Sequence, residues 1–134
     1  MIAVKWLGRL TVLALGCVPA AAAAETRFPY DSELIMDVQP MRGSKRIPNM
    51  DVDSKGTIAL EMWCNRVEGR LVVAADTLTV LTGPSTQRPC APERAQGDDQ
   101  LLSALSQVTT WRRRGDTLEL IGGPRVLKFR LPTN

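Results

Sequence analysis

The stretch Thr109–Leu131, TTWRRRGDTLELIGGPRVLKFRL, contains three short segments in which apolar and polar residues alternate. Two glycine turns, Gly115-Asp116 and Gly122-Gly123-Pro124, separate these segments. A period of two residues, interrupted by turn residues, is typical of consecutive antiparallel strands with one buried face. The third segment shows the alternation most clearly, in the order Leu127, Lys128, Phe129, Arg130, Leu131. The stretch therefore predicts a three-stranded β-meander.

Similar alternation upstream predicts further strands. Threonine and valine are frequent in these segments, and both suit a half-buried pleated surface. Proline and glycine interrupt the pattern at Pro40–Asn49 and Gly83–Pro92, which are expected to be a loop and an irregular segment. The expected strands are Ser32–Gln39, Thr57–Trp63, Glu68–Ala75, Thr77–Thr82, Thr109–Arg114, Thr117–Ile121 and Arg125–Leu131.

One segment has the spacing of a helix instead. Leu101, Leu105 and Val108 follow i, i+4, i+7, which predicts a helix that ends at Val108 and starts near Asp98, or as early as Pro92. Asp98 and its neighbour Asp99 are interpreted as an acidic helix start. The predicted fold class is mostly β (α+β), a small curled sheet or barrel of about seven or eight strands packed by one helix.

The first 24 residues have the organisation of an export signal. Two basic residues precede the apolar run Leu10–Val18, and Pro19 and the alanines Ala20–Ala24 follow. This pattern is typical of a secretory signal peptide, and the run is too short to cross a bilayer, which takes about 20 residues. We therefore expect residues 1–24 to be removed, leaving a single domain over residues 25–134 in the periplasm or outside the cell.

Cys17 leaves a lipoprotein alternative open, because Gly16 stands before it as a small residue does before an acylated cysteine. A membrane association is expected only if Cys17 is lipidated. Otherwise Cys64 and Cys90 are the cysteines that remain. Two thiols in an exported domain favour a disulfide, while a redox-active pair and two free thiols are the alternatives.

Composition limits the function classes. The chain has a net charge of +3, and two of the positive charges, Lys5 and Arg9, belong to the expected signal. The exported part is nearly neutral, so nucleic-acid binding is not expected. The chain contains no histidine, which removes the commonest general base and metal ligand. We expect no catalytic residue, no cofactor and no metal site.

The order of short motifs resembles the META domain, also called the HslJ-like family. In that family a Cys-Asn pair and a following glycine precede a Thr-x-x-x-Cys segment, a helix and a terminal hairpin. Here the family motif residues are Cys64, Asn65, Gly69, Thr86 and Cys90. Trp63 stands where the family usually has glycine. The resemblance implies a small, mostly β envelope domain with one helix, loosely tied to heat shock and drug tolerance, without an established catalytic residue.

Two sets of residues are candidates for function. Asn65 and Gly69 are interpreted as turn residues, with a left-handed backbone and a positive φ respectively, and alternatively as part of a ligand contact. Arg112, Arg113 and Arg114 are a candidate interaction patch for an anionic partner, with Arg112 and Arg114 on one face of a strand. Three further arginines are expected to extend the patch if the fold brings them near: Arg66, Arg88 and Arg94.

These observations predict a noncatalytic, monomeric envelope module that is secreted or periplasmic. We expect it to bind an envelope protein or an anionic lipid in stress or drug tolerance. The alternative is a periplasmic protein inhibitor of a hydrolase such as lysozyme, since such inhibitors are also small exported β-barrels with disulfides.

Overall fold

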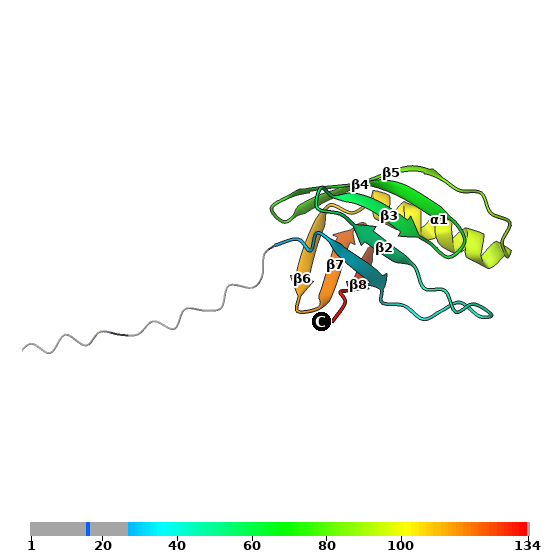
Figure 1. Cartoon of the computed structure of the whole chain (residues 1–134), viewed down its shortest axis with the longest axis horizontal. Coiled ribbons are helices and arrows are strands. Elements are labelled where there is room, and N and C mark those ends of the chain that lie inside the picture. The colour runs from blue at the N-terminus through cyan, green and yellow to red at the C-terminus, as the bar shows by residue number, and fades with distance from the viewer. Residues whose placement is uncertain (1–15, 17–26, 134) are drawn as a thin grey trace, which may run out of the picture.

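A computed structural model describes residue 16 and residues 27–133 of the chain. Apart from Gly16, the expected signal peptide lies outside the described residues, and so does Cys17. Eight strands and one helix are present in the described part (Figure 1). Their bounds are β1 Ser32–Met36, β2 Asn49–Val52, β3 Thr57–Glu61, β4 Arg66–Ala74, β5 Thr77–Ser85, α1 Pro92–Ser106, β6 Thr110–Arg114, β7 Thr117–Gly122 and β8 Arg125–Arg130.

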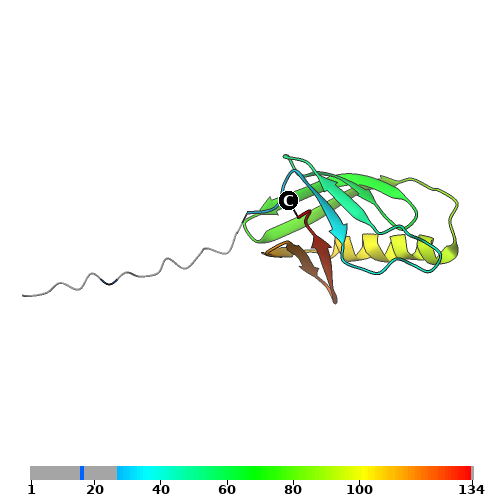
Figure 2. The ribbon, with the colours of Figure 1, turned by 60° about the horizontal axis from the view of Figure 1, so that its bottom comes forward.

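The strands form a closed barrel in which each strand pairs antiparallel with its neighbours in the sequence. The barrel closes where Ile35 of β1 pairs with Arg130 of β8. The contact between β5 and β6 is the shortest, since it has the single residue pair Thr77 and Thr110. The helix α1 runs alongside β5, where β6 has diverged from it (Figure 2). The predicted barrel with one packing helix is confirmed.

Apolar side chains fill the inside of the barrel. Alternate residues of the strands point inward, and the inner face of α1 contributes Leu101, Ala104 and Leu105. Burial of these side chains removes apolar surface from water, which is the main favourable term in folding. Several inward residues have no exposed surface: Leu34, Met50, Leu60, Leu105, Leu118, Leu120 and Phe129.

A two-residue turn, Ala75-Asp76, joins β4 and β5 as the sequence predicts. Ala75 has φ of 53°, a left-handed conformation that an alanine seldom adopts. Its carbonyl accepts a hydrogen bond of 2.8 Å from the indole Nε1 of Trp111, which is buried in β6. The tertiary contact with Trp111 helps to hold this turn in place.

Several elements differ from the sequence predictions. The four-residue strand β2 was not predicted, because Pro48 precedes it and it buries only Met50 and Val52. Strand β5 continues through Gly83 and Pro84 to Ser85, beyond the predicted end. The helix begins at Pro92, the earlier of the two predicted positions, but ends at Ser106 and not at the predicted Val108.

Gly97 lies within α1, although glycine costs stability in a helix interior. An added Cβ at Gly97 would lie 2.7 Å from Cδ1 of Trp63, so only glycine leaves room for the indole. The buried Trp63 thus packs directly on the helix backbone.

Candidate functional site: the disulfide clamp and its arginines

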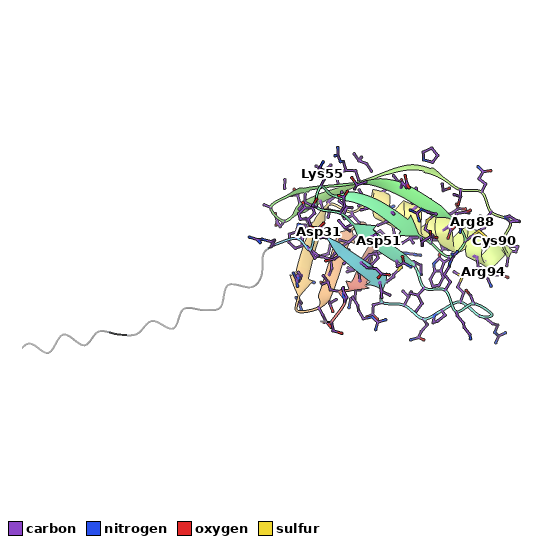
Figure 3. The ribbon with its side chains drawn as sticks, in the orientation of Figure 1. Asp31, Asp51, Lys55, Arg88, Cys90 and Arg94 are labelled. Atoms are coloured by element: carbon purple, nitrogen blue, oxygen red, sulfur yellow. A yellow bond between two sulfur atoms is a disulfide. The ribbon has the colours of Figure 1, made fainter. Side chains whose placement is uncertain are left out.

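Two segments that are distant in the sequence lie together at one end of the barrel. A disulfide joins Cys64, just after β3, to Cys90, just before α1, with a Cα–Cα distance of 6.0 Å. Cys64 is buried, whereas Cys90 is partly exposed. Figure 3 shows Cys90 at the same end of the molecule as Arg88 and Arg94. The disulfide attaches the segment between β5 and α1 to the start of β4.

Hydrogen bonds reinforce this attachment. The side-chain Oδ1 of Asn65 accepts a bond of 2.7 Å from the backbone N–H of Arg88 and one of 3.1 Å from the hydroxyl of Thr86. The Thr86 hydroxyl oxygen accepts a bond of 3.0 Å from the backbone N–H of Arg66. The Thr86 N–H donates to the Arg66 carbonyl at 2.9 Å. The motif residues Cys64, Asn65, Thr86 and Cys90 therefore form one unit, which we call the clamp.

Asp98 of α1 connects the helix to the clamp through two hydrogen bonds. Its Oδ1 accepts a hydrogen bond of 3.0 Å from the N–H of Cys64, and its Oδ2 accepts one of 2.7 Å from the N–H of Asn65. The Asp98 side chain is 3% exposed. Its interpretation as a helix start is wrong, because the helix begins six residues earlier and Asp98 lies on its buried face. The sequence contained one indication of this burial. Asp98, Leu101 and Leu105 follow i, i+3, i+7, so the Asp98 carboxylate lies on the apolar face of the helix.

Gly69 lies outside the clamp, within β4 and next to a register shift between β4 and β5. Its predicted positive φ is wrong, and so is the left-handed backbone predicted for Asn65, since neither residue is among the described residues with positive φ. Gly69 is required for a different reason. An added Cβ would overlap the carbonyl oxygen of Leu81 on the neighbouring strand, so glycine permits a close approach of two backbones.

Three arginines from separate segments surround one carboxylate beside the clamp. Glu61 Oε1 accepts a hydrogen bond of 3.1 Å from Nη1 of Arg66. Glu61 Oε2 lies 3.6 Å from Nη2 of Arg46 and 3.8 Å from Nη1 of Arg88. We call Arg46, Arg66 and Arg88 the arginine cluster. The sequence reasoning missed Arg46 and Glu61, because no local pattern shows that the loop before β2 reaches the end of β3.

The predicted patch on β6 lies elsewhere. Thr110 at the start of β6 pairs with Thr77, next to the β4–β5 turn, whereas Arg66 is at the opposite end of β4. Eight residues of strand separate Arg66 from that turn, which corresponds to roughly 26 Å. Arg88 and Arg94 lie with Cys90 at the disulfide end (Figure 3), so Arg66, Arg88 and Arg94 do not extend the β6 patch.

Within the patch, Arg112 and Arg114 point outward and Arg113 lies on the other face, where its Nε donates to the Gly115 carbonyl at 3.1 Å. The pairing register places Arg112 opposite Glu119 of β7 and Glu119 opposite Lys128 of β8. Arg114 is opposite Thr117, which is opposite Arg130. We call this outer surface the basic wall; its cations are Arg112, Arg114, Lys128 and Arg130.

Glu119 is the acidic residue in the middle of the basic wall. Its side chain is 10% exposed, and its Oε2 accepts a hydrogen bond of 2.7 Å from Nε of Arg112. That hydrogen bond, and then the charges of Arg112, Arg114 and Lys128, hold the pKa of Glu119 below its usual value, although burial acts in the opposite direction. The carboxylate stays ionised at neutral pH and helps to hold the arginines and lysine together.

In residues 27–133 there is no group of three or more cysteine, aspartate or glutamate side chains placed to hold a metal ion. Over the same residues, the helix present is not long and apolar enough to span a membrane.

The fold and the clamp together define a small antiparallel β-barrel module with one packing helix and a disulfide at one end. The chain belongs to the META-domain family, whose model matches residues 30–132. A protein from Burkholderia xenovorans, solved by NMR, is similar in fold, with a TM-score of 0.63, 17% identity, and coverage of 87% of this chain and all of that chain. A second NMR structure has a TM-score of 0.60 and 16% identity over 75% of this chain and 89% of that chain. A search of curated proteins found no significant match.

Proposed function

We propose that the protein is a noncatalytic module of the cell envelope that binds another envelope component through its outer surface. The basic wall is the observation that carries this proposal. Arg112, Arg114, Lys128 and Arg130 lie side by side on three paired strands, and Glu119 beneath them leaves an excess of positive charge. Arg130 also has an ion pair of 3.4 Å with Asp37. A concentrated positive surface attracts an anionic partner, here an acidic envelope protein or an anionic lipid.

The filled interior supports a role for the outer surface. Leu34, Leu118 and Phe129 are fully buried inside the barrel, so a ligand would have to displace well-packed side chains to enter it. The disulfide fits an oxidising compartment, which agrees with a secreted or periplasmic location. Membership of the META-domain family agrees with a role in stress or drug tolerance.

The test compares two double variants that remove the same charge. Arg114→Gln/Lys128→Gln weakens the basic wall but keeps Arg112, which the buried Glu119 needs. Lys55→Gln/Arg70→Gln removes two exposed charges from another part of the barrel. The proteins are immobilised and exposed to an envelope extract. We expect the first variant to lose the bound protein or lipid and the second to retain it; equal retention by both would refute the proposal.

A second candidate is an inhibitor of a hydrolase such as lysozyme. The long loop between β1 and β2 projects from the barrel (Figure 1), and inhibitors commonly insert such a loop into a cleft. Arg94 of α1 donates a hydrogen bond of 3.2 Å to the Gly43 carbonyl, which restrains the loop. A lysozyme assay decides this candidate: slower lysis in the presence of the protein would support it, and an unchanged rate would dismiss it.

A further inference from the structure

The arginine cluster is a second basic site, separate from the basic wall. Its three guanidinium groups approach one carboxylate, although like charges repel and surface arginines normally spread into water. Glu61 neutralises one of the three charges, so two remain. Glu68 lies 3.6 Å from Nη2 of Arg66, but its side chain is 77% exposed and gives only weak compensation. The cluster therefore keeps an excess of positive charge.

The hydrogen-bond donors of the cluster are largely uncommitted. Arg66 donates to Glu61 Oε1, and Arg46 donates from Nη1 to the Cys64 carbonyl at 3.3 Å. The remaining distances to Glu61 Oε2, 3.6 and 3.8 Å, are too long for hydrogen bonds, and this buried oxygen has no hydrogen-bond partner. Arg88 makes no hydrogen bond through its guanidinium group within residues 27–133. The three side chains are 41–46% exposed, so their donors face solvent.

The clamp fixes the position of Arg88. Its backbone N–H is bonded to Asn65 Oδ1, and Cys90, two residues further on, is bonded covalently to Cys64. Arg66 begins β4, and the Cys64 carbonyl holds Arg46. A preformed arrangement of donors binds an anion with a smaller entropy loss than three freely moving side chains would. A hollow of ≈ 260 Å³ lies next to Arg66, lined by Arg66, Glu68, Gly83, Pro84 and Thr86; Arg46 and Arg88 are not part of its lining.

From these observations we propose that Arg46, Arg66 and Arg88 bind a phosphomonoester group, which competes with Glu61 for these guanidinium groups. A phosphomonoester dianion carries about two negative charges at neutral pH and three acceptor oxygens, which matches the residual charge of the cluster. Guanidinium groups bind phosphate oxygens with two parallel hydrogen bonds, so three of them can contact one such group from different sides. The phosphomonoester can belong to a free metabolite or to a lipid headgroup.

The experiment uses the purified protein with its disulfide intact and two probes at constant ionic strength. Glycerol phosphate is the free phosphomonoester, and phosphatidylcholine vesicles containing phosphatidic acid present the same group on a membrane. Arginine Nε–H signals in NMR titrations and vesicle co-sedimentation measure binding. We expect saturable binding of at least one probe, with shifts at the cluster arginines, and the probe that binds identifies the source of the group.

Three variants separate a binding site from a structural ion-pair network. Arg88→Gln should weaken binding by roughly tenfold, because it removes one charge-assisted contact. Glu61→Gln should tighten binding severalfold, on the order of three- to tenfold, because it removes the competing charge. Arg70 is an exposed arginine on β4, the strand that also carries Arg66. The Arg70→Gln variant should bind within about twofold of the unchanged protein.

Binding should also weaken as the pH falls from about 7 to about 5, since the second proton of a phosphomonoester has a pKa near 6 while arginine stays charged. The proposal is overturned if neither probe saturates, or if Arg88→Gln and Arg70→Gln bind equally. It is also overturned if Glu61→Gln retains its fold by circular dichroism but binds less tightly. The basic wall can also attract anionic vesicles, so co-sedimentation counts for the cluster only where Arg88→Gln weakens it and Arg114→Gln/Lys128→Gln does not. With that control, this proposal and the proposed function can fail independently.

Discussion

The disulfide end and the β6–β8 meander belong to one barrel, but different kinds of interaction hold them. The meander is built from consecutive hairpins, and Gly115 and Gly123 provide the positive φ of its turns. The disulfide end joins segments that are far apart in the sequence, through Cys64, Asn65 and Asp98. The comparison teaches that local pattern specifies the meander, whereas a few long-range polar and covalent contacts specify the clamp. Substitutions in the two regions test this difference.

The largest effect is expected from the disulfide. Cys64→Ala/Cys90→Ala opens a loop with a sequence separation of 26, and the chain-entropy model then predicts a loss of about 3 kcal/mol in the free energy of unfolding. Urea denaturation measures this loss. A change below about 1 kcal/mol would mean that the disulfide contributes little to the fold.

Asp98→Ala should have the next largest effect. It leaves the N–H groups of Cys64 and Asn65 buried without an acceptor, at a cost of about 2–3 kcal/mol in the free energy of unfolding. Asp99→Ala is the matched control, since Asp99 is the exposed neighbour on the same helix and should change stability by less than about 0.5 kcal/mol. Equal effects of the two substitutions in denaturation curves would show that Asp98 does not support the clamp.

Asn65→Ala should have an intermediate effect. It removes the acceptor for the Arg88 N–H and the Thr86 hydroxyl; both donors are exposed, so we expect a loss of only about 1–2 kcal/mol. Thr86→Val should cost less, because the backbone bond from Thr86 to Arg66 remains. Denaturation curves of both variants test this order, and a greater loss for Thr86→Val would reverse our assignment of Asn65 as the central acceptor.

The smallest effect is expected in the meander and depends on pH. The pKa of Glu119 is lowered in the folded protein, so its ionised form stabilises the fold fully at pH values above its usual pKa of 4.5. This contribution is lost as the pH falls through the lowered value. Glu119→Gln should therefore cost about 1 kcal/mol at neutral pH and progressively less in acid. A stability difference between the two proteins that does not change down to about pH 3 would contradict this account.

The comparison also explains which features could be predicted from the sequence. The period-two alternation around Leu127 and Phe129 and the glycine turns predicted the meander, because neighbouring strands pair locally. The short strand β2 was missed because its pairing with β1 and β3 is visible only in three dimensions. The expected disulfide between Cys64 and Cys90 suggested that the two clamp segments meet.

The function of single side chains at the disulfide end was harder to predict. The Asp98 carboxylate accepts hydrogen bonds from the N–H groups of Cys64 and Asn65, which lie 34 and 33 residues away in the sequence. No local pattern shows these contacts, so Asp98 was interpreted as a helix start. Gly69 was assigned a positive φ, although a neighbouring backbone and not a turn requires it. The loop before β2 brings Arg46 to Glu61, which no local spacing indicates.

Amide hydrogen exchange, measured on oxidised and reduced protein, tests most directly whether the clamp is a locally held unit on an otherwise self-sufficient barrel. The Arg88 amide, bonded to Asn65 Oδ1, should be protected in the oxidised protein and lose most of its protection on reduction. The amides of Trp111 and Leu118 in the meander should remain protected in both states. Protection of Arg88 that persists after reduction, or loss of protection at Arg88, Trp111 and Leu118 together, would contradict the account.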